Sequence, residues 1–275
     1  MRAATGSFAG VLGWPLAHTL SPAIHNHAFR SLGLDWVYLR WPVSPESLEP
    51  AVAGLRALGA SGANVTMPHK ETIVGLLDDV TDEARTLGAV NTVARVGETL
   101  VGHNTDVGGF SQFLAGDAGW RTEGNEVLVL GAGGAARAVV KALADLGAAR
   151  ILISARRAER VDDLMEIVRH ADGATGAGSV KWDEAAAAVE KADLVVNTTP
   201  VGMGGESLLP DARFRREQCV VDLVYRPPTT PFTARARSEG ADAWGGLGML
   251  VHQAAESFRI WTGHEPPIEV MSAAA

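Results

Sequence analysis

Apolar runs separated by turn residues organise the first 107 positions of this 275-residue chain. Short apolar runs bounded by glycine or proline predict strands, and apolar positions three and four residues apart predict helices. Strands are expected at 8–13, 36–41, 63–66, 90–95 and 99–102, and helices at 23–32, 47–58, 70–77 and 82–87. Gly97 separates the last two strands as in a hairpin. This part therefore predicts a three-layer α/β domain with mixed strand direction.

The rest of the chain alternates strands and helices more regularly after a linker at 119–125. Strands are expected at 127–130, 150–154, 178–181, 194–197, 220–224 and 241–243. Helices between most of them predict a parallel, doubly wound sheet. A last helix with apolar spacing follows Gly245, ends at Gly263, and is expected to return to the first domain. The predicted domains are 1–107 together with 245–275, and 108–244.

A glycine turn follows the strand at 127–130. Gly131, Gly133 and Ala136 occupy the small-residue positions of a G-x-G-x-x-G/A fingerprint. The first permits a tight turn, the second lets backbone approach a pyrophosphate, and the third lets the helix pack closely on the strand. The helix N-terminus then offers free N–H groups to phosphates. The residues of this turn expected to bind a dinucleotide are Gly131, Ala132, Gly133, Gly134 and Ala135.

Composition narrows the function classes. The net charge is −8, which argues against a nucleic-acid binder that works by neutralising phosphates. No apolar run reaches membrane-spanning length, and the N-terminus does not resemble a signal peptide, so a soluble cytoplasmic protein is expected. The single cysteine, Cys219, cannot form an internal disulfide and is expected to be a core thiol. No zinc-type spacing is present, and no metal is expected.

Polar clusters stand at the ends of strands or the starts of helices, where side chains can face a cleft. They are Thr19 with Ser21, residues 64–70, Asn91 with Thr92, residues 102–106, and Gln253. Taken singly, each has an ordinary structural explanation. Ser21 could be a helix cap before Pro22, Lys70 an exposed first-turn lysine, Asp106 a helix cap, and Asn91 a hairpin-turn residue.

In order along the chain, these clusters resemble the signatures of the shikimate dehydrogenase family. The matching segments are Pro15-x-x-His18-Thr19-x-Ser21-Pro22, Asn64-Val-Thr-Met-Pro-His-Lys70, Gly88-Ala-Val-Asn91-Thr, Asn104-Thr-Asp106, Asp222-Leu-Val-Tyr225-x-Pro and Met249-Leu-Val-His-Gln253. The resemblance covers nearly the whole chain. It implies an oxidoreductase with an N-terminal substrate domain and a Rossmann-type NADP-binding domain. The implied reaction is the reversible NADPH-dependent reduction of 3-dehydroshikimate to shikimate, on the route to chorismate and aromatic amino acids.

The resemblance implies that Lys70 and Asp106 are the catalytic pair, and the chemistry agrees. Hydride addition to a ketone builds negative charge on oxygen, which an ammonium can stabilise and protonate. A nearby carboxylate can orient the lysine. The substrate contacts implied by the resemblance are Thr19, Ser21, Thr66, Asn91, Tyr225 and Gln253. Thr19 and Ser21 match a hydroxyl pair that binds the substrate carboxylate, although the family most often has serine at the first position.

The segment after the strand at 150–154 bears on the choice of cofactor. It carries Arg156, Arg157 and Arg160, and no acid stands where the strand stops. An acid there would bind the ribose 2′-hydroxyl of NAD, whereas a guanidinium can bind a 2′-phosphate. Ala155 stands where the family has asparagine, and Arg157 where it has a small hydroxyl residue. The match also assigns Thr198 and Gly246 to cofactor binding. A strong preference for NADP(H) is expected.

Two alternatives stay open at this stage. One is a quinate/shikimate dehydrogenase that uses NAD, and the other is a catalytically silent NADP(H)-binding protein. An intact Lys70–Asp106 pair argues against the second. The small-molecule site is expected between the two domains, with no nucleic-acid or membrane partner, in a monomer or homodimer.

Overall fold

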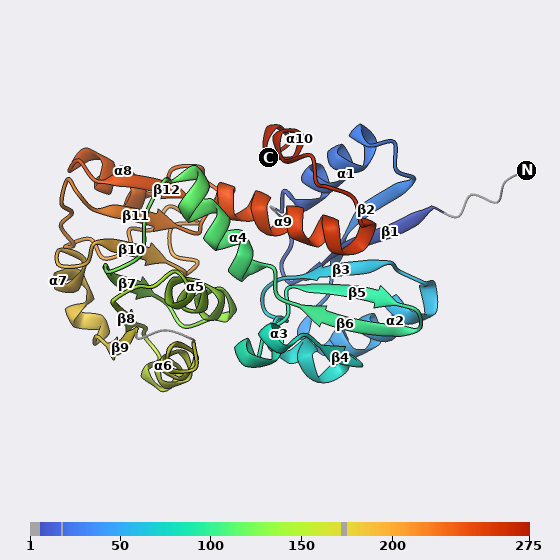
Figure 1. The fold of residues 1–275 in the computed structure, drawn as a ribbon, viewed down its shortest axis with the longest axis horizontal. Helices are drawn as coiled ribbons and strands as arrows, with labels where there is room; N and C mark the ends of the chain where they lie inside the picture. Colours follow the sequence, from blue (N-terminus) through green and yellow to red (C-terminus); the bar gives the residue numbers. More distant parts are fainter. Residues whose placement is uncertain (1–5, 18, 172–174) are drawn as a thin grey trace, which may run out of the picture. The chain divides into compact units, whose positions relative to one another are not determined.

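The computed structural model describes residues 6–17, 19–171 and 175–275, and it divides into two compact units (Figure 1). The first unit is Met1–Gly109 together with Val251–Ala275, and the second is Phe110–Leu250. The chain leaves the first unit within helix α4 (Asp106–Gln112) and returns within helix α9 (Leu247–Thr262). The sequence placed these two crossings a few residues earlier. His18, which belongs to the first motif, lies outside the described residues.

The first unit is built on a mixed sheet with the strand order β2-β1-β3-β5-β6-β4. The strands are β1 (Ser7–Gly13), β2 (Trp36–Pro42), β3 (Gly62–Val65), β4 (Asp79–Val80), β5 (Thr92–Val96) and β6 (Thr99–His103). β5 runs antiparallel to both of its neighbours, and the other pairs are parallel. The predicted mixed direction and the hairpin at Gly97 are therefore confirmed.

The helices of the first unit are α1 (Ser21–Ser31), α2 (Leu48–Leu58), α3 (Asp82–Leu87), α10 (Ile268–Ala273) and the part of α9 from Val251 onward, with the 3-10 turns η1 (Pro45–Ser47) and η2 (Thr72–Leu76). Most of them pack against this sheet, and α10 packs on α1. The helix predicted at 70–77 is only the short η2. Its segment contains β-branched residues and Gly75, which lower helix propensity. In α9, Trp261 Nε1 donates to the Val93 carbonyl at 2.9 Å, so the end of this helix is fixed to the sheet.

The second unit has the predicted parallel, doubly wound sheet, in the order β12-β11-β10-β7-β8-β9. The strands are β7 (Glu126–Leu130), β8 (Arg150–Ser154), β9 (Gly176–Ser179), β10 (Leu194–Asn197), β11 (Cys219–Asp222) and β12 (Asp242–Gly245). All five strand pairs are parallel. β9 lies two residues before its predicted position, in a glycine-rich stretch where apolar periodicity gives a weak signal.

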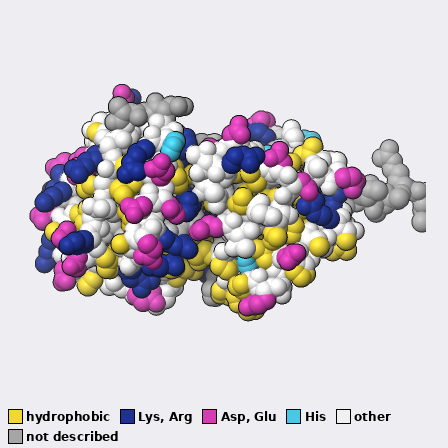
Figure 2. All heavy atoms as spheres, turned by 90° about the horizontal axis from the view of Figure 1, so that it is seen from below, with side chains coloured by type: hydrophobic (Ala, Val, Ile, Leu, Met, Phe, Trp, Pro, Cys, Tyr) yellow, Lys and Arg dark blue, Asp and Glu magenta, His cyan; other side chains and the backbone are white. Residues whose placement is uncertain are grey.

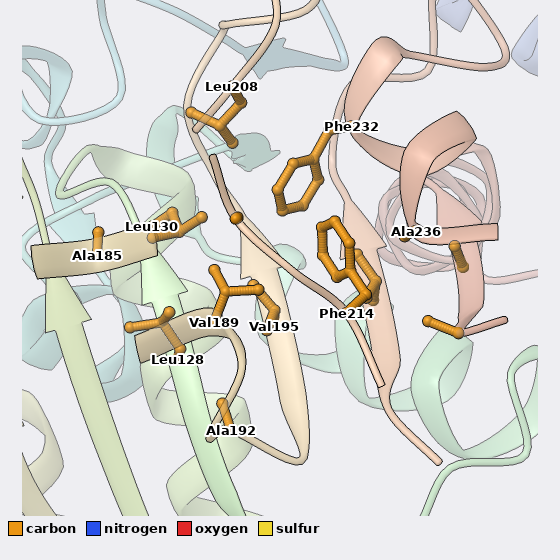
Figure 3. Packing of buried hydrophobic residues seen from close by; sticks show 14 residues of the cluster. Leu128, Leu130, Ala185, Val189, Ala192, Val195, Leu208, Phe214, Phe232 and Ala236 are labelled. Carbon is orange, nitrogen blue, oxygen red and sulfur yellow. The ribbon is translucent and has the colours of Figure 1, made fainter. Parts of the chain in front are cut away.

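Helices and a buried apolar cluster complete the second unit. The helices are α5 (Gly134–Asp145), α6 (Val161–Arg169), α7 (Ala185–Val189) and α8 (Pro231–Ser238), with the shorter turns η3 (Phe113–Asp117), η4 (Ala158–Arg160) and η5 (Trp182–Glu184). Figure 3 shows Leu128 and Leu130 of β7 in one cluster with the rings of Phe214 and Phe232. These rings meet edge to face at 5.2 Å. Cys219 is fully buried, as predicted, and burial raises the pKa of its thiol to about 12.

The surface of the described residues does not point to a particular class of function. On the face seen in Figure 2, acidic and basic side chains of the described residues are interspersed. In the described part of the chain, no helix is both long and apolar enough to cross a membrane.

Candidate active site

Lys70 and Asp106 form an ion pair in the first unit, in which Lys70 Nζ donates to Asp106 Oδ2. Their side chains are only 16% and 5% exposed. Lys70 lies in the segment that follows β3, and Asp106 is the first residue of α4. Lys70 is therefore not the exposed first-turn lysine of the structural alternative. An ammonium held by a shielded carboxylate has a defined position from which to exchange a proton.

Asn91 fixes the other oxygen of the Asp106 carboxylate. Its Nδ2 donates to Asp106 Oδ1 at 2.7 Å, and its Oδ1 accepts from the Thr105 backbone N–H at 2.8 Å. Asn91 is 2% exposed and lies just before β5, not in the hairpin turn. Because Thr105 N–H can only donate, it determines which way round the Asn91 amide lies. Asp106 is thus held on both oxygens in one orientation.

Gln253 reaches the same group of residues from α9. Its backbone carbonyl accepts from Thr105 Oγ1 at 3.0 Å, and its side-chain Oε1 lies 3.5 Å from Asn91 Nδ2. A Cβ atom added at Gly109 would lie 2.7 Å from the Gln253 backbone nitrogen, so glycine lets α4 and α9 approach closely. The prediction that the terminal helix packs on the first domain is confirmed. A contact of the Gln253 amide with substrate stays a prediction.

A buried polar network behind these residues was not predicted from the sequence. Tyr38 Oη donates to Asn64 Oδ1 at 2.6 Å, and Asn64 Nδ2 donates to Thr92 Oγ1 and Ser257 Oγ at 3.0 and 2.9 Å. Thr105 Oγ1 is within 3.3 Å of both hydroxyl oxygens. The available signal was a set of polar residues inside apolar strands and on the apolar face of α9. Such residues are buried only where they find partners, which the chain order does not show.

The Thr19 and Ser21 hydroxyls lie together at the start of α1. Ser21 is the first residue of this helix and makes no side-chain cap, so the interpretation of Ser21 as a helix cap is wrong. The Thr19 hydroxyl accepts from the Ser21 backbone N–H at 3.3 Å and donates to Ser21 Oγ at 3.2 Å. The N-cap position is Leu20, and the Ser21 hydroxyl, which does not cap the helix, bonds with Tyr38. Two hydroxyls at a helix N-terminus suit a carboxylate.

Replacing both Thr19 and Ser21 with alanine is expected to raise KM for shikimate about 10- to 100-fold, the scale of lost hydrogen bonds to a charged group. KM for NADP should stay within about twofold. Steady-state kinetics with each ligand varied separately measure both values. Ser31→Ala, which removes a hydroxyl that bonds Ala28 at the other end of α1, is the control. Equal effects on the two ligands would show that the pair only shapes the helix.

The other predicted substrate residues occupy different places. Thr66 follows β3, donates its backbone N–H to the Leu12 carbonyl at 2.9 Å, and is partly exposed. Tyr225 follows β11 and belongs to the second unit. Two further polar residues of the motifs make hydrogen-bond contacts within the fold. His69 Nε2 lies 2.7 Å from the Val43 carbonyl, and Asn104 Oδ1 accepts from the Asp106 backbone N–H at 3.1 Å.

The glycine turn of the second unit has the features that the fingerprint requires. Gly131 has a φ of +114°, and a Cβ atom there would collide with the Thr198 hydroxyl. Gly133 is the N-cap of α5, lacks a side-chain cap, and has open space where a Cβ atom would stand. Ala136 is fully buried against the sheet. The residues between and after the two glycines, Ala132, Gly134 and Ala135, are partly exposed. This turn leaves backbone N–H groups accessible to a pyrophosphate.

Two more predicted cofactor residues line the ends of strands in the same unit. Thr198 follows β10 and donates its hydroxyl to the Leu130 carbonyl at 2.8 Å, which braces the glycine turn. Gly246 follows β12, and a Cβ atom there would collide with the Leu223 carbonyl oxygen. Both residues therefore shape the carboxyl edge of the sheet, where dinucleotides bind in this fold.

The basic loop after β8 borders a hollow of about 490 Å³. Arg156 and Ala155 line it from one side, and Lys181 and Trp182 line it from the segment after β9. Arg156 and Arg157 are exposed, and Arg160 precedes α6 as its N-cap. The hollow is large enough for a phosphate group with its water. The position of Lys181 there was not predicted, because it depends on how β8 and β9 pair.

The comparisons with known proteins bear on all of these segments. Residues 11–93 match the shikimate dehydrogenase substrate binding domain, 114–203 match shikimate / quinate 5-dehydrogenase, and 246–275 match the shikimate 5′-dehydrogenase C-terminal domain. A shikimate dehydrogenase (NADP(+)) from Geobacter metallireducens is 48% identical over 95% of this chain and 93% of its own length. The chain belongs to the shikimate dehydrogenase family.

Solved structures of relatives agree with this family assignment. Shikimate 5-dehydrogenase from Thermus thermophilus, in complex with NADP(H) and shikimate, has a TM-score of 0.86 and 38% identity, covering 98% of each chain. Quinate dehydrogenase from Corynebacterium glutamicum, in complex with NAD, has a TM-score of 0.87 and 30% identity, also covering 98% of each chain. The fold therefore occurs in solved structures with either cofactor bound.

One carboxylate in this shikimate dehydrogenase family member stands out electrostatically. Burial raises the pKa of Glu256 on α9 to about 7. The negative charges of Glu83 and Asp106 act in the same direction, and Arg259 acts against them. No other acid among the described residues has its pKa raised so far while remaining partly exposed. Sequence reasoning missed Glu256, although it stands three residues after Gln253 on the same helix.

Glu256→Gln is expected to stabilise the protein at pH 8 by about 1–2 kcal/mol, with no effect below pH 4.5. The folded state resists ionising Glu256, so stability falls as pH rises from the unfolded pKa of 4.5 to the folded value of about 7. The glutamine variant avoids this loss. The full shift would correspond to about 3 kcal/mol, and partial exposure reduces it. Denaturant unfolding at pH 4, 6 and 8 measures the effect. A difference in the free energy of unfolding between variant and wild type that is the same at all three pH values would contradict it.

Proposed function

We propose that this chain catalyses the reversible NADP(H)-dependent interconversion of 3-dehydroshikimate and shikimate. The observation that carries the proposal is the Lys70–Asp106–Asn91 constellation, with Asp106 and Asn91 buried, in a member of the shikimate dehydrogenase family. Relatives with NADP and with shikimate bound support the assignment of both ligands. The proposal includes action in the cytoplasm. It also includes a monomeric or homodimeric state, which analytical ultracentrifugation tests.

The cofactor site fits a dinucleotide phosphate. The left-handed Gly131, the open space at Gly133 and the uncapped start of α5 accommodate a pyrophosphate. Arg156 and Arg157 are exposed near the end of β8, where the ribose of a bound dinucleotide lies in this fold. When bound, NADPH supplies the hydride for the carbonyl carbon. The protein residues have to hold the substrate and deliver the matching proton to oxygen.

Lys70 is the proton donor in this proposal. As hydride reaches the ketone carbon, negative charge builds on its oxygen, and an ammonium beside that oxygen stabilises the charge and transfers its proton. Asp106 holds Lys70 by the ion pair and is itself held by Asn91. In the reverse direction, the neutral amine of Lys70 accepts the hydroxyl proton as hydride leaves the carbon. Thr19 and Ser21 would bind the substrate carboxylate, and Thr66, Tyr225 and Gln253 would add contacts to the ring hydroxyls.

The quinate alternative is favoured by the NAD-dependent relative, whereas the loop after β8 argues for NADP. No acid follows Ser154 at the end of β8, and Ala155, Arg156 and Arg157 stand there. A guanidinium attracts a 2′-phosphate, and the missing acid removes the usual ribose contact of NAD.

The test is absorbance of the reduced nicotinamide with shikimate or quinate and NADP or NAD, in all four pairings. Shikimate with NADP is expected to give the highest kcat/KM. Turnover of quinate with NAD at an equal or higher kcat/KM would favour the quinate enzyme. Tight NADP binding without turnover of either acid would favour the silent binding protein.

A further inference from the structure

Thr92 is the first residue of β5, and its side chain is fully buried. The antiparallel pairing of β3 with β5 puts Asn64 directly opposite Thr92, so that both side chains lie on the same face of the sheet. Asn64 Nδ2 donates to Thr92 Oγ1 at 3.0 Å. Because no part of Thr92 is exposed, any contribution it makes to the reaction has to pass through its neighbours.

The supply of donors and acceptors fixes the direction of the hydrogen bonds around Thr92. The Asn91 backbone carbonyl can only accept, and it lies 3.3 Å from Asn64 Nδ2, so the nitrogen of the Asn64 amide faces this group. Tyr38 Oη donates to Asn64 Oδ1 on the other side of the amide, at 2.6 Å. Thr92 Oγ1 therefore receives a hydrogen from Asn64, and its own hydroxyl hydrogen points to a different acceptor.

That acceptor is the side-chain oxygen of Asn91. Thr92 Oγ1 lies 3.0 Å from Asn91 Oδ1, which can only accept, so Thr92 has to supply the hydrogen between the two oxygens. Asn91 Oδ1 also accepts from the Thr105 backbone N–H at 2.8 Å. Ser257 Oγ, 2.8 Å from Thr92 Oγ1, has a hydrogen of its own for that contact. Two donors thus hold the oxygen end of the Asn91 amide.

We propose that Thr92 is a positioning residue, whose hydroxyl holds the Asn91 amide in the orientation that fixes the Asp106 carboxylate. The inference rests on the proposed function. Asn91 Nδ2 donates to Asp106 Oδ1 at 2.7 Å, and Asp106 Oδ2 accepts from Lys70. An Asn91 amide turned end for end would set its oxygen against the carboxylate, where two acceptors repel each other. The bonds from Thr92 and Thr105 to Asn91 Oδ1 disfavour that turn.

Thr92→Val removes the hydroxyl and keeps the shape of the side chain. It is expected to lower kcat for shikimate oxidation about 3- to 10-fold, the scale of one neutral hydrogen bond, with KM for NADP within about twofold of wild type. Thr92→Ser keeps the hydroxyl and should bring kcat back to within about twofold of wild type. Thr99→Val is the matched control, because the exposed Thr99 hydroxyl donates to the Val96 carbonyl at 2.7 Å in the same hairpin.

A double-mutant cycle separates positioning from packing. In an Asn91→Ala background, Thr92→Val should change kcat by less than about 1.5-fold, because the group through which Thr92 acts is gone. A Thr92 side chain that only packed β5 would lower kcat by the same factor in both backgrounds, and this result would overturn the inference. If Thr92→Val does not fold, Thr92→Cys, whose thiol is a weak donor, takes its place in every comparison.

A measurement without turnover separates this inference from the proposed function. In a proton–nitrogen NMR spectrum, the side-chain amide signals of Asn91 are those that Asn91→Ala loses. Exchange of these hydrogens with water should be at least about threefold faster in Thr92→Val, and unchanged in Thr92→Ser and Thr99→Val. Equal exchange rates in Thr92→Val and wild type would overturn the inference, whether or not shikimate is a substrate. Faster exchange in a protein that does not oxidise shikimate would overturn only the proposed function.

Discussion

Lys70→Ala is expected to lower kcat for shikimate oxidation by about 10²–10³-fold while KM for shikimate stays within a small factor. Loss of one group that stabilises charge in the transition state typically has this cost. Lys70 is 16% exposed and is held by Asp106, which Asn91 orients in turn. The lysine thus has a defined place, and water cannot easily substitute for it. Steady-state kinetics of the purified variant, with shikimate and NADP each varied, measure the effect.

Two further variants serve as comparisons for Lys70→Ala. Lys191→Ala removes an exposed lysine of the second unit and should leave kcat unchanged. Asp106→Asn should also reduce kcat, because an amide holds an ammonium less firmly than a carboxylate does. If Lys70→Ala turned over at a near-normal rate with a normal circular dichroism spectrum, the assignment of Lys70 as proton donor would be wrong.

Arg156→Ala is expected to weaken NADP binding by about 1.5–3 kcal/mol and to leave NAD binding nearly unchanged. A hydrogen bond between a guanidinium and a phosphate is worth about this much. Arg156 is exposed, lines the hollow after β8, and forms no salt bridge within the described residues. Its charge is therefore available to a ligand. Isothermal titration calorimetry with NADP and NAD measures both affinities.

Arg169→Ala is the matched control for Arg156. Arg169 is an exposed arginine at the end of α6, paired with Glu166 at 2.7 Å on the same helix. Its replacement should change neither affinity. Equal loss of NADP and NAD affinity in Arg156→Ala would mean that Arg156 contacts a part common to both cofactors. Wild-type protein that binds and uses NAD as well as NADP would show that this reading of the loop is wrong.

The local order of residues was enough to predict the fold class and the second unit. The alternation of apolar strands and helices follows from backbone periodicity, and the glycine turn follows from the steric needs of Gly131 and Gly133. Five of the six strands of that sheet begin within one residue of their predicted positions, and the glycine-rich β9 begins two residues early. These features depend on contacts between near neighbours in the chain, which a sequence shows directly.

Shorter elements of the first unit were less predictable. β4 has only two residues, Asp79 and Val80, and pairs with β6 from a position that no periodicity marks. The segment at 70–77 has apolar helical spacing but contains only a 3-10 turn, because its β-branched residues and Gly75 have low helix propensity.

In the candidate site, too, one part could be predicted from the sequence and another part only from the tertiary structure. The sequence by itself indicated the candidate residues for the chemistry, because Lys70, Asn91, Asp106 and Gln253 stand in ordered motifs. Only the tertiary structure decided how they are held. The Ser21 hydroxyl does not cap α1, because the helix begins at Ser21 itself and its N-cap position is Leu20. The Glu256 carboxylate lies against α4 because Gly108 has no side chain there to exclude it. Burial and charge act through space, so burial and the charge of a residue about 150 positions away can raise the pKa of Glu256 without any sign in its local sequence.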